Sequence, residues 1–374
     1  MRWSIRIATV AGIGIFVHVT FILLVILFFA QFLQQGGVGY AVQATLTVLA
    51  LFGCVILHEL GHALTALRFG VKTRDITMLP IGGVARLERI PEEPIQELLI
   101  AIAGPAVNVV IAAGIFVILK AFGWSNSWDI EEISRPRLGV EPFLRNLLTM
   151  NVGLVVFNLI PAFPMDGGRI LRSLLGFFLD HVAATRIAAR VGQILAVGFA
   201  LLGLGAFGVP PNPIIVLIAV FVFLGATGEA ATKELQQVFR GVPASAGMLR
   251  DFRALSAGNT LRDAVDMLLA GSQMDFPVLD GSTVVGVLRR QDLIRGLKER
   301  GLDVPVSAVN LLKVAPVSAD APLYQALGEL DRQQSWCLPL EKDGAIVGWI
   351  TRQNVTEIAM VRQALGPGEP GLRN

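Results

Sequence analysis

Charged residues are scarce and unevenly placed in this sequence. Asp, Glu, Lys and Arg make up 16% of the 374 residues, hydrophobic residues make up 53%, and no Asp, Glu, Lys or Arg occurs from Ile7 to His58. This composition is typical of a polytopic membrane protein that carries some soluble mass. From Lys233 onward, charges recur every few residues, as they do in a soluble domain. We therefore expect two parts that meet near Lys233.

Cysteine is also nearly absent. Cys54 and Cys337 are the two cysteines of the chain, and they lie in different parts without metal-like or redox spacing. This excludes a disulfide framework and a zinc site built from cysteines. The chain also has no block of Lys and Arg that could follow a phosphate backbone, and its formal net charge is only +2, so no nucleic-acid partner is expected.

The N-terminal apolar run has no A-x-A-like cleavage site and is longer than the core of a signal peptide, so it is expected to be a retained first span. An α-helix needs about 20 apolar residues to cross the hydrocarbon core of a bilayer. Apolar runs of about this length, each with no more than two charged residues, cover roughly residues 8–33, 42–67, 96–120, 144–162, 191–208 and 213–231. Prolines between Val209 and Pro213 divide the last two, because proline interrupts a helix. Six transmembrane helices are therefore predicted.

The basic residues near the ends of these runs predict the orientation, because Lys and Arg are retained on the cytoplasmic side. If six spans alternate, one side receives three groups of bases: Arg2 and Arg6; Arg68, Lys72, Arg74, Arg86 and Arg89; Arg169, Arg172, Arg186 and Arg190. The opposite side receives a neutral loop, the proline turn and residues 124–137, in which acids at least match bases. We expect a multi-pass protein of the cell (inner) membrane with both termini in the cytoplasm.

A metal-binding pattern lies inside the second predicted span. His58 and His62 are four residues apart and share one face of a helix, while Glu59 can address a water held between them. An ionised group at bilayer depth costs at least about 2.5 kcal/mol, so it indicates a functional site. The alternative is a polar helix end at the membrane surface. Arg68 follows His58 by ten residues, about 15 Å along a helix, which disfavours that alternative.

A catalytic zinc site needs a third protein ligand and an open position. His18 lies within the first predicted span and His181 in an amphipathic segment, so both are poor candidates. Asp166 is better, because it ends the fourth span and arrives at a depth similar to that of His58 and His62. The adjacent glycines, Gly167 and Gly168, and the prolines Pro161 and Pro164 are expected to turn the backbone there. Taken alone, this segment could equally be a surface turn.

The HExxH pattern in a second span, followed by Asn158, Pro161, Asp166 and Gly167 in the order N-x-x-P-x-x-x-x-D-G, resembles the site-2 protease family of intramembrane zinc metalloproteases. The resemblance covers residues 8–232. Two further stretches agree with it: Thr77–Glu88 resembles the family's membrane-associated strand segment, and Ala103–Ala112 its small-residue third span.

The resemblance implies a role for each matching residue. His58, His62 and Asp166 would bind one Zn²⁺ per chain, and Glu59 would be the general base. Asn158 and Asn108 would help to position the substrate or the oxyanion.

The C-terminal part contains an internal repeat of strand, helix, strand, strand and helix. A linker at 233–242 precedes the two copies, which cover 243–306 and 307–365, and a tail occupies 366–374. The repeat resembles a pair of CBS modules, which form an intertwined α/β unit and in many proteins bind ATP, ADP or AMP.

The nucleotide-contacting pattern of that family is a glycine, a hydroxyl residue and then an aspartate three positions on. The corresponding residues are Gly348, Thr351 and Asn354 in the second module and Gly286, Arg289 and Asp292 in the first. Each module departs from the pattern at one position. Thr351, Asp292 and Asn354 are therefore candidate nucleotide ligands, and the alternative is a structural or dimerising module that forms a homodimer.

The expected fold is thus a polytopic α-helical membrane protein with six transmembrane helices, a small membrane-associated β segment and a C-terminal α/β CBS pair. The expected function is intramembrane proteolysis: zinc-dependent hydrolysis of a peptide bond in or near the transmembrane segment of a protein anchored in the lipid bilayer, modulated by an adenine nucleotide. The alternative is a CBS-regulated membrane transporter or channel without protease activity. A transporter needs no glutamate beside a histidine at zinc spacing, and transporters commonly have repeated spans, which the six runs lack.

Overall fold

The computed structural model describes residues 3–80, 82–87, 91, 93–124, 138–239, 241–249, 252–271, 273–281 and 283–365. The chain divides into two compact units, Met1–Ala231 and Thr232–Asn374, which we describe separately. The predicted tail at 366–374 and most of the acidic loop, 125–137, lie outside the described residues.

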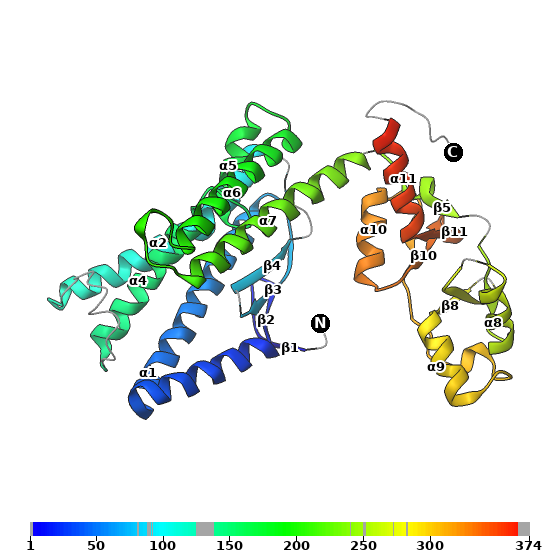
Figure 1. The fold of residues 1–374 in the computed structure, drawn as a ribbon, viewed down its shortest axis with the longest axis horizontal. Coiled ribbons are helices and arrows are strands. Elements are labelled where there is room, and N and C mark those ends of the chain that lie inside the picture. Colours follow the sequence, from blue (N-terminus) through cyan, green and yellow to red (C-terminus); the bar gives the residue numbers. More distant parts are fainter. Residues whose placement is uncertain are drawn as a thin grey trace. The chain divides into compact units, whose positions relative to one another are not determined.

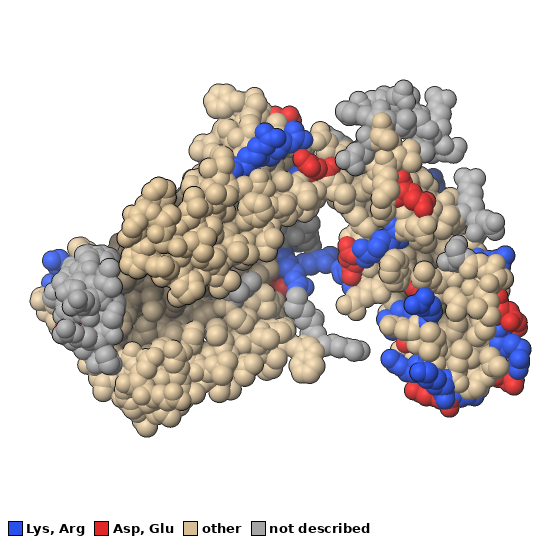
Figure 2. All heavy atoms as spheres, in the orientation of Figure 1, with Lys and Arg blue, Asp and Glu red and all other residues tan. Residues whose placement is uncertain are grey.

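Long apolar helices dominate the first unit (Figure 1). Among the described residues, five helices are long and apolar enough to cross a membrane: α1 Val19–Arg68, α2 Pro94–Ala121, α4 Val140–Asn158, α6 His181–Gly203 and α7 Pro213–Val238. A short helix, α5 (Asp166–Gly176), and a 3-10 turn, η1 (Ala206–Gly208), connect them. On the face drawn in Figure 2 these helices are almost bare of charged residues, which gather near α5 and one end of the unit.

Helix α1 covers residues 19–33 of the first predicted span and all of the second, 42–67. Its 50 residues include two with non-helical backbone, Gly36 and Gly37. A side chain at Gly36 would collide with Tyr40, and Gly37 has a φ of +73°, which favours glycine. The helix turns a corner at this break (Figure 1). The predicted count of six spans is therefore neither confirmed nor excluded by the five helices.

A four-stranded sheet corrects the predicted start of the first span. Its strands are β1 Ser4–Val10, β2 Ile13–His18, β3 Thr73–Leu79 and β4 Gly82–Leu87, in the order β1-β2-β3-β4. The first span was predicted from residue 8, but residues 4–18 form a hairpin and α1 starts at Val19. Ala11 and Gly12, both with positive φ, form its two-residue turn. Hydropathy missed the hairpin because apolar strands and apolar helices have similar composition.

The sheet packs against the second arm of α1, the part of the helix that follows the break at Gly36 and Gly37. Ile13 and Ile15 of β2 and Ile76 and Met78 of β3 form one buried cluster with Leu60 and Ala63 of α1. Strand β2 of the hairpin pairs in parallel with β3. The hairpin and the predicted membrane-associated β segment, which includes the end of β3 and all of β4, therefore belong to one sheet. The sheet is thereby fixed to the helix that carries the HExxH pattern.

The chain turns at residues 159–165, before α5, and not at Gly167 and Gly168 as predicted. Both glycines are helical residues of α5, so their predicted role as turn residues is wrong. A side chain at Gly167 would overlap the backbone oxygen of Ile160, and one at Gly168 would lie 2.6 Å from the backbone carbon of Ala162. Glycine is needed there for close approach of α5 to the preceding loop, not for an unusual φ.

The second unit contains two copies of the predicted repeat. The first has β6 Leu255–Ser256, α8 Leu261–Leu269, β7 Phe276–Asp280, β8 Thr283–Leu288 and α9 Arg290–Arg300; the second has β9 Val317–Ser318, α10 Leu323–Arg332, β10 Cys337–Lys342, β11 Ala345–Thr351 and α11 Arg352–Leu365. Their registers correspond, since Val278 pairs with Gly286 in one copy and Leu340 with Gly348 in the other.

The two copies are intertwined through short connecting elements. The turns η2 (Ala244–Gly247) and η3 (Val306–Ala308) flank the first copy. Strand β5 (Met248–Leu249) follows η2 and joins the sheet of the second copy, in the order β5-β11-β10-β9, whereas β6-β7-β8 form the sheet of the first copy. Helix α7 continues to Val238, so the first residues of the predicted linker at 233–242 are helical.

Candidate metal centre

The second arm of α1 places two imidazoles on one face. His58 and His62 are one helical turn apart, and their Nε2 atoms are 3.1 Å from each other. Both residues are buried, with 6% and 4% of their surface exposed. Glu59 follows His58 directly and is half-buried.

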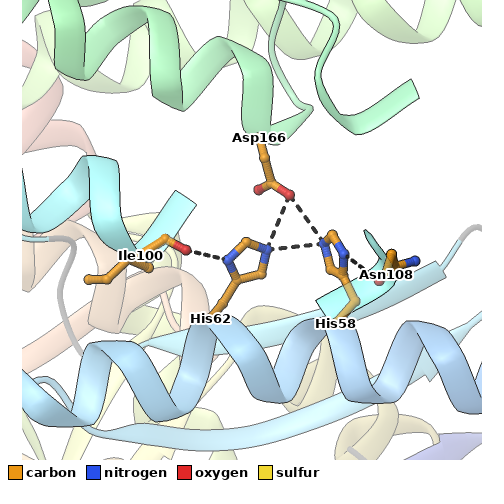
Figure 3. A network of polar contacts seen from close by, with 5 residues as sticks. All are labelled: His58, His62, Ile100, Asn108 and Asp166. Atoms are coloured by element: carbon orange, nitrogen blue, oxygen red, sulfur yellow. Dashed lines mark hydrogen bonds and ion pairs between the residues drawn. The ribbon is translucent and has the colours of Figure 1, made fainter. Parts of the chain in front are cut away.

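Asp166 reaches the two histidines from another element. It is the first residue of α5, and its Oδ2 atom lies 3.1 Å from Nε2 of His58 and 3.1 Å from Nε2 of His62. Figure 3 shows the carboxylate facing both rings from the opposite side of the site. Within the described residues, these three side chains are a group of His, Cys, Asp or Glu residues that could hold a metal ion, and their ligand atoms lie within 4.8 Å of one another.

The Nδ1 atoms of His58 and His62 point away from the site, and their hydrogen-bond partners show where each imidazole carries a proton. His62 Nδ1 lies 2.6 Å from the carbonyl oxygen of Ile100, and His58 Nδ1 lies 3.2 Å from Oδ1 of Asn108; both partners are on α2 (Figure 3). A carbonyl oxygen only accepts, so each Nδ1 carries the proton and donates it. In a neutral ring that carries its proton on Nδ1, the lone pair of Nε2 is directed into the site.

Two nitrogen lone pairs and a carboxylate oxygen therefore converge in a buried space. Three acceptors at this separation repel one another unless a cation lies between them. Two imidazoles and one carboxylate, with oxygen acceptors holding the distal imidazole nitrogens, are a ligand set typical of catalytic zinc. The residues present therefore fit a zinc ion.

Helix α2 also shapes the site through Gly104, which sequence reasoning had not singled out. A side chain at this position would overlap His62 Nε2 and lie 2.7 Å from His58 Nε2. The α2 backbone can thus lie against the ligand atoms only because residue 104 has no Cβ. The small-residue stretch at 103–112 was the signal that could have indicated this close approach.

Strand β4 passes beside Glu59. A side chain at Gly83 would lie 2.7 Å from Cγ of Glu59. Strand β4 is also at the edge of its sheet, so one of its sides has no partner strand among the described residues. An edge strand therefore borders Glu59, the acid next to the candidate metal ligands.

The remaining candidates of the first unit have other contacts. Asn108 is fully buried and holds His58, while its Nδ2 has no hydrogen-bond partner among the described residues. Asn158 ends α4 and is half-buried, with no hydrogen bond to the metal-site side chains described here. Their roles toward substrate stay predictions. His18 caps the start of α1, and His181 starts α6.

A cavity of about 340 Å³ lies between the two copies in the second unit. Thr351 and Asn354 line it with the aromatic rings of Phe252 and Trp336 and with Asp275. Thr351 Oγ1 donates to Asn354 Oδ1 over 2.7 Å. Burial raises the pKa of Asp275, whose Oδ2 has no partner in the described part of the chain. This volume is within the range of small-molecule pockets.

Asp292 is not among the residues that line this cavity. It is buried, and its Oδ2 lies 2.6 Å from Nε of Arg289, the residue that replaces the hydroxyl of the expected pattern. The two copies therefore differ at the expected nucleotide-contacting positions: Asp292 of the first copy is paired with Arg289, whereas Thr351 and Asn354 of the second copy line the cavity. The predictions that Thr351, Asn354 and Asp292 bind nucleotide stay untested.

Comparison with known proteins agrees with the metal centre. Peptidase family M50 matches residues 46–202, and the CBS domain family matches residues 244–299. A zinc metalloprotease of Methanocaldococcus jannaschii is 35% identical over 77% of this chain and 78% of its own. A Synechocystis protein whose name includes zinc metalloprotease is 27% identical over 95% of both chains.

A solved site-2 protease structure from Methanocaldococcus jannaschii is 38% identical, with a TM-score of 0.44, and the match covers 61% of this chain and 95% of that one. The relative that is 35% identical spans more than three quarters of both proteins, so the relationship is not confined to a motif. The chain therefore belongs to peptidase family M50, the site-2 protease family of membrane zinc metalloproteases.

Proposed function

We propose that this metalloprotease hydrolyses a peptide bond in or near the transmembrane segment of a membrane-anchored protein. One observation carries the proposal: two imidazole nitrogens of the apolar helix α1 and one carboxylate oxygen of α5 converge beside Glu59. A transporter needs no such group, and family membership favours the protease over the transporter or channel.

The chemistry of the site follows from its residues. His58, His62 and Asp166 would hold zinc, which supplies Lewis acidity and lowers the pKa of a bound water to about 7. Glu59 accepts the proton of the attacking water and later delivers it to the leaving amine. Ile100 and Asn108 keep the imidazoles oriented throughout, because their oxygens hold the Nδ1 protons.

The proposed topology has six crossings. A straight helix of 50 residues would extend about 75 Å, more than twice the thickness of a hydrocarbon core of about 30 Å. The break at Gly36 and Gly37 supports two crossings within α1, and α2, α4, α6 and α7 supply the others. With the basic residues inside, both termini are cytoplasmic in the cell membrane and the metal centre lies toward the inner face.

A transmembrane substrate must unwind before hydrolysis, because a helix occupies its carbonyls in hydrogen bonds. We propose that the unwound substrate pairs with the free side of β4, which passes beside Glu59 at Gly83. Strand addition would satisfy the released backbone donors and acceptors. The bond to be cleaved would then lie near the general base.

Cleavage of a purified single-span substrate in liposomes tests this function. We expect products cut within or next to the apolar segment, and at least about tenfold slower cleavage by Val84→Pro, because proline removes a strand donor. Val84→Ala keeps the backbone N–H and is the control. Unchanged cleavage by Val84→Pro would contradict strand addition, and cleavage confined to a soluble region would contradict the proposed function.

Modulation by an adenine nucleotide is the second part of the proposal. Helix α7 packs Val222 against Ala162 and Met165 of the loop before Asp166, then continues past Ala231 into the second unit. Phe239, which directly follows the last residue of α7, is buried in the core of the second CBS copy. Helix α7 thus packs on the loop before Asp166 within the first unit, and the chain continues directly from it to a core residue of the second unit; this continuity of sequence is the route that we propose for coupling.

Binding of AMP to the full-length protein tests the nucleotide site. We expect Thr351→Val to weaken binding about tenfold or more, because a hydrogen bond to a charged group contributes about 1.5–3 kcal/mol. Thr356→Val removes an exposed hydroxyl of α11, which is not among the cavity residues, and should bind AMP as the wild type does. Calorimetric titration measures both. Equal affinities of wild type and Thr351→Val would refute the assignment.

A further inference from the structure

A buried arginine lies behind the metal centre. Arg172 of α5 is 0% exposed and is the largest of the fully buried side chains described. Its Nε donates to Glu97 Oε1 over 2.8 Å, its Nη2 contacts the same oxygen, and its Nη1 pairs with Glu229. The guanidinium carbon also lies 5.0 Å from the ring centroid of Phe163. One side chain of α5 therefore binds carboxylates from two other helices.

These partners connect the two halves of the metal centre. Glu97 belongs to α2 and lies three residues before Ile100, whose carbonyl oxygen holds His62. Arg172 lies six residues after Asp166 on α5, about 9 Å along the helix axis. The ion pair thus joins the helix that orients one ligand to the helix that carries another.

The third carboxylate belongs to α7. Glu229 is near the end of the first unit, and its side chain is 30% exposed, whereas that of Glu97 is 4% exposed. Upstream on α7, a side chain at Gly225 would lie 2.5 Å from Cδ of Pro164, so this helix also lies against the loop before Asp166. The position of α5 is therefore set by α2 on one side and α7 on the other.

Stability alone does not explain such an arrangement. Apolar residues of similar volume often stabilise a protein as well as a buried ion pair does, because burial of charge is costly. A guanidinium with two carboxylate partners does fix direction and distance, since its donors form a rigid planar fork. A metal site needs this kind of control, because its ligands have to be held within about 0.5 Å of the productive geometry.

The geometry points to Arg172 as a positioning residue of the metal centre: through Glu97 and Glu229 it holds α5, and hence Asp166, against the helix that orients His62. The role deepens the zinc-dependent hydrolysis proposed above. It predicts that loss of Arg172 affects metal affinity and turnover more than substrate binding.

The test uses the full-length protein in lipid nanodiscs and three variants. Arg172→Gln should bind zinc about 10–100-fold more weakly in chelator competition. Its kcat should fall about 100-fold, the effect expected of a misplaced group, with KM changed less than about threefold. Arg172→Lys keeps the charge without the fork and should restore part of both losses. Arg190→Gln, exposed on α6, should match the wild type.

Wild-type zinc affinity and kcat in folded Arg172→Gln would overturn the proposal. If that variant does not accumulate, Glu229→Gln keeps the pair with Glu97 and should still show smaller losses of zinc affinity and kcat; wild-type values there would overturn it equally. Zinc affinity is measured without cleavage. A failure of proteolysis in all proteins, with zinc affinity lowered as expected, would therefore reject the proposed function and leave the positioning role standing.

Discussion

Replacing Glu59 with glutamine is expected to abolish peptide hydrolysis while zinc remains bound. Glutamine keeps the size of the side chain and removes the group that accepts the proton of the attacking water. General acid–base catalysis contributes about 10²–10⁴-fold, so the rate of cleavage should fall by at least about 100-fold. The measurement combines cleavage of a purified single-span substrate with the zinc content of the same protein.

Two features make this result specific. The proposed ligand atoms belong to His58, His62 and Asp166, so the zinc content should stay at one ion per chain. Glu93→Gln changes an exposed glutamate at the start of α2 and should cleave as the wild type does. Wild-type cleavage by Glu59→Gln would remove the general base from the mechanism, and loss of zinc would indicate that Glu59 is a ligand.

Addition of one methyl group at Gly104 is expected to have an effect of similar size by another route. The new Cβ would overlap Nε2 of His62 and lie 2.7 Å from Nε2 of His58, so the imidazoles or α2 would have to move. We expect Gly104→Ala to bind zinc at least about 10–100-fold more weakly, the range seen when support of a metal ligand is lost. Cleavage should fall in parallel at limiting zinc.

The same helix offers a matched control. A Cβ at Gly114, ten residues further along α2, meets no atom within 4 Å. Both substitutions raise the helix propensity of α2 by about 0.5–1 kcal/mol, so any difference between the variants reflects the site and not the helix. Equal zinc affinity of Gly104→Ala, Gly114→Ala and the wild type would show that α2 does not pack against the ligand atoms.

The sequence was most informative where polar residues interrupt an apolar stretch and where a pattern repeats. A HExxH pattern within an uncharged run, and Asp166 after a proline-containing segment, indicated three residues that the structure brings within 3.1 Å. The repeated elements of the second unit were also visible, because the aligned Gly286 and Gly348 occupy equivalent pairs in their sheets.

Other features depend on packing that a pattern does not contain. The hairpin was predicted in part as a helix, from residue 8 onward, because Val10, Ile13 and Ile15 are apolar and hydropathy does not distinguish an apolar strand from an apolar helix. The carbonyl of Ile100 and the missing Cβ of Gly104 are backbone features that become recognisable only when α1 and α2 are in contact. Arg172 was interpreted as a basic residue near the membrane surface, whereas it is fully buried between two carboxylates.

The zinc-edge X-ray absorption spectrum of the full-length protein tests the central claim most directly. The account predicts one zinc ion per chain with two imidazole nitrogens and otherwise oxygen ligands, and a spectrum that loses its imidazole features, or its zinc, in a protein with both His58→Ala and His62→Ala. Sulfur in the coordination shell, or an unchanged spectrum in that double variant, would contradict it.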